Sequence, residues 1–130
     1  MILLDTDVMI DLLRQYPPAV AWLNSLGNEE IYLPGFVVME LIQGCRSRAE
    51  QEKLERELDP YGVAWPSPTA CDQAISTFSK YHLSHGLGIL DALIGQMALS
   101  LNLPLYTFNE KHYPIPGLLT RQPYKKDLHE

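Results

Sequence analysis

Three carboxylates occur inside runs of sequence that are otherwise almost wholly apolar. They are Asp5, Glu40 and Asp91, and their neighbours are mainly Leu, Ile, Val and Met. An ionised carboxylate is costly to bury without a compensating charge, and no Lys or Arg occurs in any of the three runs. A shared divalent cation is the simplest compensation, because hard oxygen ligands suit Mg²⁺ or Mn²⁺. The three acids therefore predict the metal site of an enzyme.

Each acid also has a purely structural interpretation. Asp5 could cap a helix that starts at Thr6, and Asp91 could cap a helix over 92–101, because Asp is a preferred residue at helix N-termini. Glu40 could face the solvent from an amphipathic helix. These alternatives stay open for each residue taken singly.

Two glycines favour the functional interpretation of the acids. Gly44 and Gly95 each follow an acid, Glu40 or Asp91, by four positions. In a helix the residue at i+4 tends to cover the one at i, so glycine there predicts open space beside the carboxylate. Gly44 could instead end its helix, whereas Gly95 lies inside a helical pattern, where glycine costs about 1 kcal/mol relative to alanine.

A fourth polar element follows an apolar strand near the C-terminus. Thr107 and Asn109 alternate with Tyr106 and Phe108, so they share one face if the strand continues through them. That face is expected to meet Asp5 and Asp91. Ordinary turn chemistry is the alternative for a Thr-x-Asn segment. Asp7 is a weaker candidate that could act through a water molecule.

Size and composition indicate one domain of a globular protein. The chain has 130 residues, 46% of them hydrophobic, and a formal net charge of −6, so we expect a single domain over 1–130 and no simple electrostatic binder of nucleic acid. No apolar run approaches the roughly 20 residues of a membrane span, and the N-terminus lacks a signal-peptide pattern. The cysteines and histidines have no zinc-site spacing. These features predict a cytoplasmic protein.

The apolar pattern predicts strands that alternate with helices. This arrangement indicates an α/β/α sandwich with a short, mainly parallel central sheet flanked by helices. In such a sheet ligands bind at the carboxyl ends of the strands, where Asp5 and Thr107 are expected. The expected strands are 2–4, 30–33, 61–65, 103–108 and 117–120, and the expected helices are 6–14, 18–27, 36–43, 48–58, 69–82 and 89–101.

Four segments together resemble the PIN domain, and in particular the VapC-type toxins of toxin–antitoxin pairs. They are LLDTDV at 3–8, VMEL at 38–41, LDALI at 90–94 and LYTFN at 105–109, and the likeness covers nearly the whole chain. The resemblance implies a PIN-like fold, Mg²⁺- or Mn²⁺-dependent cleavage of RNA, inhibition by a cognate antitoxin, and a homodimer.

By position, the resemblance assigns metal binding to Asp5, Asp91 and Glu40, and it adds Thr107 and Asn109 to the catalytic set. We expect Asp5 and Asp91 to bind one Mg²⁺ directly and Glu40 to bind it directly or through water. Thr107 and Asn109 would orient these ligands or bind a phosphate oxygen.

The sequence departs from the resemblance at His112, where many relatives carry a fourth acid. This departure keeps open a degenerate PIN domain that acts only as a protein-interaction module, with an antitoxin or second subunit bound at a patch of Tyr16, Pro17, Pro18 and Trp22. A phosphoryl-accepting receiver domain is a weaker alternative. It needs a lysine at a strand end, and none occurs near 105–107. A basic rim for phosphate is expected from Arg46, Arg48, Lys111 and His112, with solvated surface charge as the alternative.

Overall fold

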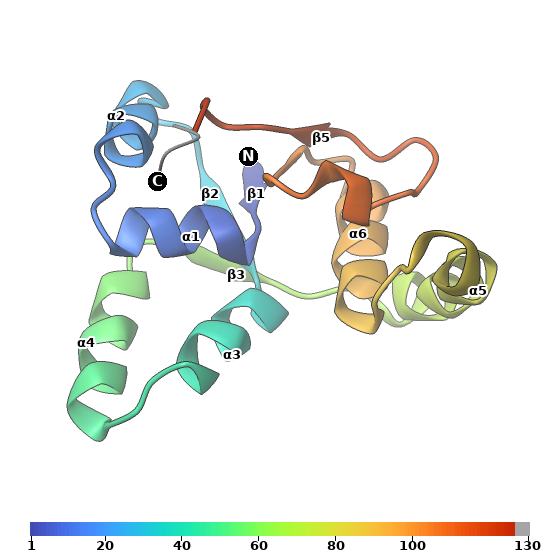
Figure 1. Cartoon of the computed structure of the whole chain (residues 1–130), viewed down its shortest axis with the longest axis horizontal. Helices are drawn as coiled ribbons and strands as arrows, with labels where there is room; N and C mark the ends of the chain where they lie inside the picture. Colours follow the sequence, from blue (N-terminus) through green and yellow to red (C-terminus); the bar gives the residue numbers. More distant parts are fainter. Residues whose placement is uncertain (127–130) are drawn as a thin grey trace.

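The computed structural model describes residues 1–126, which form one α/β unit (Figure 1). Short buried strands and longer helices follow one another along the chain, as the apolar pattern predicts. In chain order the elements are β1 (Ile2–Leu4), α1 (Thr6–Leu13), α2 (Pro17–Ser25), β2 (Ile31–Pro34), α3 (Gly35–Gln43), α4 (Arg48–Leu58), β3 (Gly62–Ala64), α5 (Pro68–His85), α6 (Ile89–Leu101), β4 (Leu105–Tyr106), the 3₁₀ turn η1 (Glu110–His112) and β5 (Thr120–Arg121).

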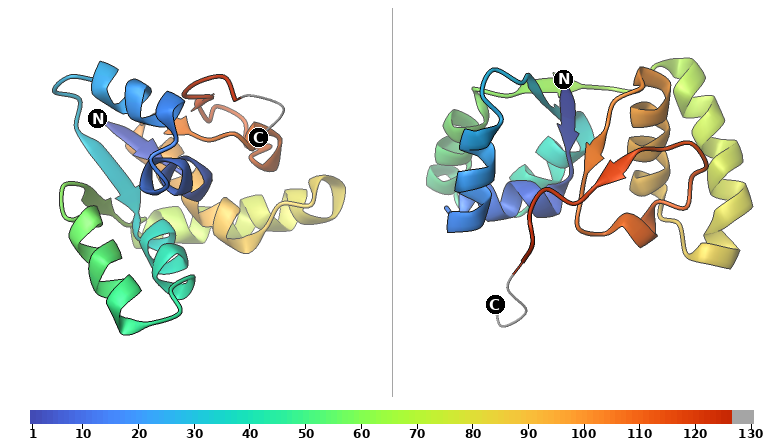
Figure 2. Two further views of the ribbon diagram at one scale, coloured as in Figure 1. Left: turned by 60° about the vertical axis from the view of Figure 1, so that its left-hand side comes forward. Right: turned by 90° about the horizontal axis from the view of Figure 1, so that it is seen from above.

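The five strands form one parallel sheet in the order β3-β2-β1-β4-β5. The chain first winds from β1 outward to β2 and β3, and then returns to the other side of β1 for β4 and β5. Helices α1 to α4 lie on one side of the sheet, and α5 and α6 lie on the other (Figures 1 and 2). The α/β/α sandwich expected from the sequence is therefore confirmed.

Local sequence explains where several helices begin and end. Pro17 and Pro18 occupy the first turn of α2, where their missing N–H groups cost nothing. Ser67 accepts a hydrogen bond from the backbone N–H of Ala70 and so caps α5. Gly86 ends α5 in the left-handed conformation (φ 65°), which glycine adopts without strain.

The hydrophobic core lies on both faces of the central strand. Leu3 and Leu4 of β1 are fully buried, as are Val8 and Met9 of α1 and Met97 of α6. Helix α6 is buried along its middle, from Ile94 to Ala98, which agrees with its nearly uniform apolar sequence. The carboxyl end of β1 is therefore held by packing from both sides, which fixes the position of Asp5.

Strand β4 is shorter than the sequence predicts. It ends at Tyr106 instead of running to 108, and the fifth strand is Thr120–Arg121 instead of 117–120. The physical reason lies in Asp7, whose Oδ2 accepts a hydrogen bond from the Phe108 N–H at 2.9 Å and thereby turns the chain toward α1. Gly117 has φ 84°, so it serves the preceding turn and not the strand.

In the described part of the chain, no helix combines the length and the apolar character needed to cross a membrane.

Candidate active site

The candidate site lies where the winding of the sheet reverses. Strands β1 and β4 are neighbours, yet the connections that leave them run in opposite directions across the sheet. Such a reversal opens a crevice at the carboxyl ends of the strands, and ligands of parallel α/β folds bind there. Asp5 directly follows β1, and Thr107 directly follows β4.

Asp5 is held at this point by three hydrogen bonds. Its Oδ1 accepts from the backbone N–H of Thr6 at 2.9 Å, so Asp5 does cap α1. Its Oδ2 accepts from the Thr107 hydroxyl at 3.0 Å and from the Tyr113 hydroxyl at 2.8 Å. The capping interpretation is therefore confirmed for Asp5, which is only 9% exposed, and the cap does not prevent Oδ2 from bonding to residues after β4.

Asp7 organises the segment after β4, a larger part than the sequence assigns to it. Its Oδ2 accepts from the Phe108 N–H at 2.9 Å and the Asn109 Nδ2 at 3.0 Å, with Thr107 Oγ1 at 3.4 Å, and its Oδ1 accepts from the Val8 N–H at 2.8 Å. Burial raises the pKa of Asp7, and the nearby Asp5 adds to that shift, while the bond from Phe108 opposes it.

The alternation of Thr107 and Asn109 was predicted to face Asp5 and Asp91. Thr107 does reach Asp5, but Asn109 bonds to Asp7, and its backbone N–H bonds to the Thr107 hydroxyl at 3.0 Å. The expected strand does not continue through these residues. Thr107 and Asn109 instead lie in a turn, and hydrogen bonds to Asp7 of α1 hold this turn in place.

Glu40 and Asp91 complete an acidic cluster around Asp5. Burial raises the pKa of Glu40, and the negative charges of Asp5 and Asp91 raise it further. Burial likewise raises the pKa of Asp91, and Asp5 adds to it, while His112 and a hydrogen bond with Tyr113 oppose the shift. Three acids far apart in sequence thus lie within electrostatic reach of one another.

Asp91 is not the cap of its helix. Helix α6 begins at Ile89 with Gly88 at the N-cap, so Asp91 lies in the first turn instead of before a helix over 92–101. That alternative is wrong. A carboxylate in a first turn is favoured by the helix dipole, which helps to hold a negative charge at this end of α6.

The expectation of open space beside Asp91 is also wrong. A Cβ atom added at Gly95 would lie 2.4 Å from Ile115 Cδ1 and 3.2 Å from Tyr113 Cδ1, so glycine is needed there because the segment after η1 packs directly onto α6. Gly44 is the C-cap of α3, the other interpretation that the sequence allows.

Tyr113 is the residue that sequence reasoning missed. Its ring is buried, its hydroxyl bonds to Asp5, and its pKa is raised strongly by burial and by the charges of Asp5 and Asp91. Proximity to the Thr-x-Asn segment is a weak signal for it. Nothing in the local pattern shows that this tyrosine turns inward while His112 beside it stays exposed.

Within residues 1–126, no Lys or Arg forms an ion pair with any of the three clustered acids, Asp5, Glu40 and Asp91. Lys126 pairs with Asp11 at 3.1 Å, and Asp11 is not one of the three clustered acids. All four residues of the expected basic rim are exposed, namely Arg46, Arg48, Lys111 and His112.

The donor set fits a hydrated hard cation. All three acids carry carboxylate oxygens, and a positive charge placed among them would relieve their mutual repulsion. In residues 1–126, no three Asp, Glu, His or Cys side chains already converge tightly enough to enclose a metal ion. Mg²⁺ suits such an open set, because it keeps several waters and takes few carboxylates directly.

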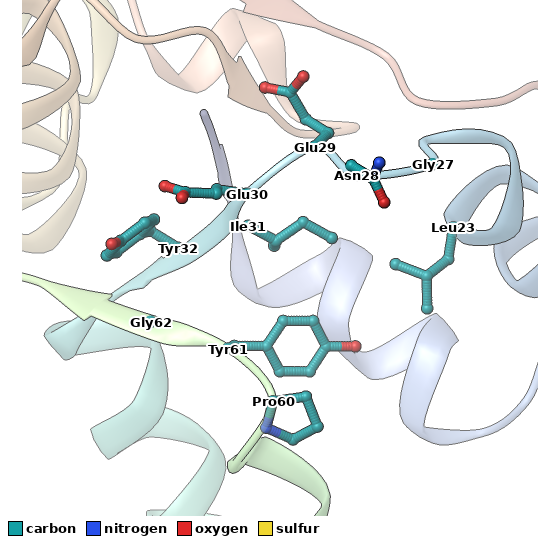
Figure 3. Close-up of a pocket in the computed structure, with 10 residues that line it drawn as sticks. All are labelled: Leu23, Gly27, Asn28, Glu29, Glu30, Ile31, Tyr32, Pro60, Tyr61 and Gly62. Carbon is teal, nitrogen blue, oxygen red and sulfur yellow. The ribbon is translucent and has the colours of Figure 1, made fainter.

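Two hollows on the surface differ in their relation to this cluster. One, of about 610 Å³, lies between α1, α3 and α4, and Thr6 and Glu40 form part of its wall. The other, of about 520 Å³, lies at the amino end of β2, with Leu23 on one side and Pro60 and Tyr61 on the other (Figure 3). Only the first hollow borders the clustered acids.

The proposed interaction patch is partly used inside the molecule. The Trp22 ring packs on the rings of Tyr106 and Tyr124, with centroids 5.2 and 6.2 Å away. Tyr16 also packs on Tyr124, at 6.1 Å. These aromatic residues are half-buried, so the C-terminal segment already covers part of the patch.

Comparison with known proteins identifies the family to which this fold belongs. The family model described as PIN domain matches residues 2–118, and the chain belongs to the PIN-domain family. Its likeness to VapC-type toxins, expected from the sequence, is confirmed by the relatives. The chain is 33% identical over 118 residues to Ribonuclease VapC19 of Mycobacterium tuberculosis. The alignment covers 87% of this chain and 92% of the relative.

Other matches lead to the same family. Toxin FitB of Neisseria gonorrhoeae is 39% identical over 103 residues, covering 71% of this chain and 74% of that protein. Among solved structures, VapBC2 from Rickettsia felis bound to a DNA fragment from its promoter superposes with a TM-score of 0.76 at 26% identity, covering 93% of this chain and 98% of that chain.

Proposed function

We propose that this chain is a divalent-metal-dependent endoribonuclease, the toxin of a VapBC-type toxin–antitoxin pair. The observation that carries the proposal is the cluster of Asp5, Glu40 and Asp91, which lies at the reversal point of the sheet without a pairing Lys or Arg in residues 1–126. Three negative carboxylates held close together repel one another, which disfavours their ionised forms. A cation bound among them would offset this repulsion, and relatives named ribonuclease support the reaction class.

Asp5 and Asp91 would bind the cation directly, and Glu40 would bind it directly or through a water molecule. When bound, Mg²⁺ or Mn²⁺ supplies a Lewis acid that activates water and stabilises charge on the phosphate undergoing attack. Of these acids, Glu40 borders the hollow between α1, α3 and α4. This arrangement supports entry of substrate from that side.

Thr107 and Asn109 act as positioning residues in this proposal. The Thr107 hydroxyl donates to Asp5 and accepts from the Asn109 backbone, so both of its bonding directions are used within the protein. Asn109 donates its amide to Asp7. The two residues thereby fix the carboxylates of β1 and α1 relative to β4, and ligand orientation is favoured over direct phosphate binding.

The partners follow from chemistry and from the relatives. The phosphates of RNA are repelled by a chain of net charge −6. The cation, with Lys111 and His112, would supply the positive charge that binds the substrate. Solved relatives include toxin–antitoxin complexes, which supports an antitoxin partner for this chain. A homodimer and a cytoplasmic location belong to the same proposal.

The test is inducible expression of the wild type and of Asp91→Asn, followed by sequencing of the RNA ends that appear. Asp91→Asn is preferred to Asp5→Asn as the first variant, because Asp5 also caps α1. We expect growth arrest and new RNA ends with the wild type alone. New ends of the same abundance with a folded Asp91→Asn protein would refute the assigned role.

A degenerate domain that only binds a partner is the alternative, and the exposed His112 in place of a fourth acid favours it. That alternative predicts antitoxin binding by the purified protein together with no cleavage across a broad RNA panel. Cleavage of any RNA that requires Asp91 excludes it.

A further inference from the structure

Tyr113 makes a buried contact with the acidic cluster that the proposed roles do not use. Its side chain is 6% exposed, and its hydroxyl donates to Asp5 Oδ2 at 2.8 Å. The charge of Asp91 also acts on this tyrosine, so the ring lies near a second acid of the cluster. Tyr113 therefore bonds directly to Asp5 and lies within the field of Asp91.

The fold is built to bring this ring to the cluster. Tyr113 directly follows η1, and its backbone N–H bonds to the carbonyl of Glu110 at 3.0 Å. The ring and Ile115 then pack against Gly95, where a Cβ atom would come within 3.2 Å of Tyr113 Cδ1. The glycine in α6 thus permits a close approach that places the hydroxyl beside Asp5.

The hydrogen bonds of Asp5 show what this hydroxyl does. A carboxylate offers about four acceptor positions on its two oxygens. Three are filled, by the Thr6 N–H on Oδ1 and by the Thr107 and Tyr113 hydroxyls on Oδ2. The donors hold both oxygens, so the carboxylate cannot rotate freely, and about one position is left for a further bond.

We propose that Tyr113 is a positioning residue that orients Asp5 toward the cation of the proposed nuclease. The inference rests on the proposed function, because it gives Asp5 a cation to face. Groups that hydrogen-bond to metal ligands fix the orientation of those ligands, and their loss typically costs about 10- to 100-fold in metal affinity. A buried tyrosine with a merely structural role would change stability and leave metal affinity unaltered.

The experiment is a titration of the purified protein with Mn²⁺, followed by electron paramagnetic resonance of the free ion. The variant is Tyr113→Phe, which removes the hydroxyl and keeps the ring against Gly95. The matched control is Tyr124→Phe, which removes a tyrosine hydroxyl bonded to Asp11 at 2.6 Å, outside the cluster. We expect Tyr113→Phe to weaken Mn²⁺ binding at least about tenfold and Tyr124→Phe to change it less than about twofold.

Equal affinities of the wild type and Tyr113→Phe would overturn the inference and leave the proposed function intact. A wild type that binds no Mn²⁺ and cleaves no RNA would overturn both. Incorporation of 4-aminophenylalanine at position 113 keeps a donor in place and covers the case in which Tyr113→Phe does not fold. That protein should bind Mn²⁺ within about threefold of the wild type, and a tenfold loss would contradict a positioning hydroxyl.

Discussion

Asp7→Ala tests how the segment after β4 is attached to the rest of the site. The substitution removes two bonds that cross between α1 and this segment, from the Phe108 N–H at 2.9 Å and the Asn109 amide at 3.0 Å. Hydrogen bonds to a charged acceptor contribute about 1.5–3 kcal/mol each. The bond from the Val8 N–H joins adjacent residues within α1, so it does not attach the segment after β4.

An opposing term reduces the expected loss. Burial and the neighbouring Asp5 raise the pKa of Asp7, so the fold bears a cost for its charged form that the alanine variant escapes. We therefore expect a net loss of about 2–3 kcal/mol in the free energy of unfolding. In urea this corresponds to a midpoint lower by roughly 1–2 M for a domain of this size.

Urea denaturation in EDTA, followed by circular dichroism, measures this loss without any contribution from metal binding. Asp72→Ala on α5 is the matched control, because Asp72 is exposed and its loss should cost less than about 0.5 kcal/mol. If Asp7→Ala unfolds at the same urea concentration as Asp72→Ala, the bonds of Asp7 do not hold the segment, and the reasoning fails.

Two further predictions concern packing and charge. Gly95→Ala should lower the free energy of unfolding by about 1–2 kcal/mol, because its Cβ would lie 2.4 Å from Ile115 Cδ1 and overpacking outweighs the gain in helix propensity. A Cβ atom added at Gly44 would lie no closer than 3.5 Å to any neighbouring atom, so Gly44→Ala should be neutral or slightly stabilising. Equal thermal midpoints for the two variants would count against the packing argument. In EDTA, stability should fall as pH rises above the ordinary carboxyl range, because the raised pKa of Asp91 means that the folded state binds more protons than the unfolded state. Asp91→Asn should reduce this slope in thermal unfolding measured upward from the ordinary carboxyl pKa range, and an unchanged slope would show that burial and Asp5 do not raise the pKa of Asp91.

Much of the fold could be predicted because its signals are local. Buried parallel strands appear as short apolar runs, and the residues that end them are polar, so β1 and Asp5 could be placed from the sequence alone. Helix α6 was predicted with its observed bounds, Ile89–Leu101, because a long apolar segment between glycine and a strand has few other interpretations. These features depend on neighbours along the chain.

The parts of the site that were missed depend on distant contacts. The sequence gives Asp7 only a weaker role through a water molecule, but in the structure Asp7 accepts hydrogen bonds from Phe108 and Asn109 in the segment after β4. Gly95 suggested empty space, yet the chain after η1 fills it. Tyr113 could not be placed for the same reason, since its direction is set by packing on α6 and not by its neighbours.

The central claim is that the acids at the reversal of the sheet act through a bound cation to cut RNA. The most direct measurement is cleavage of a single-stranded RNA panel by the purified chain, first in EDTA and then with Mg²⁺ or Mn²⁺, beside Asp91→Asn as a folded control. The account predicts cleavage that appears only with the metal and is lost in Asp91→Asn. Cleavage that persists in EDTA, or that Asp91→Asn retains at the wild-type rate, would contradict it.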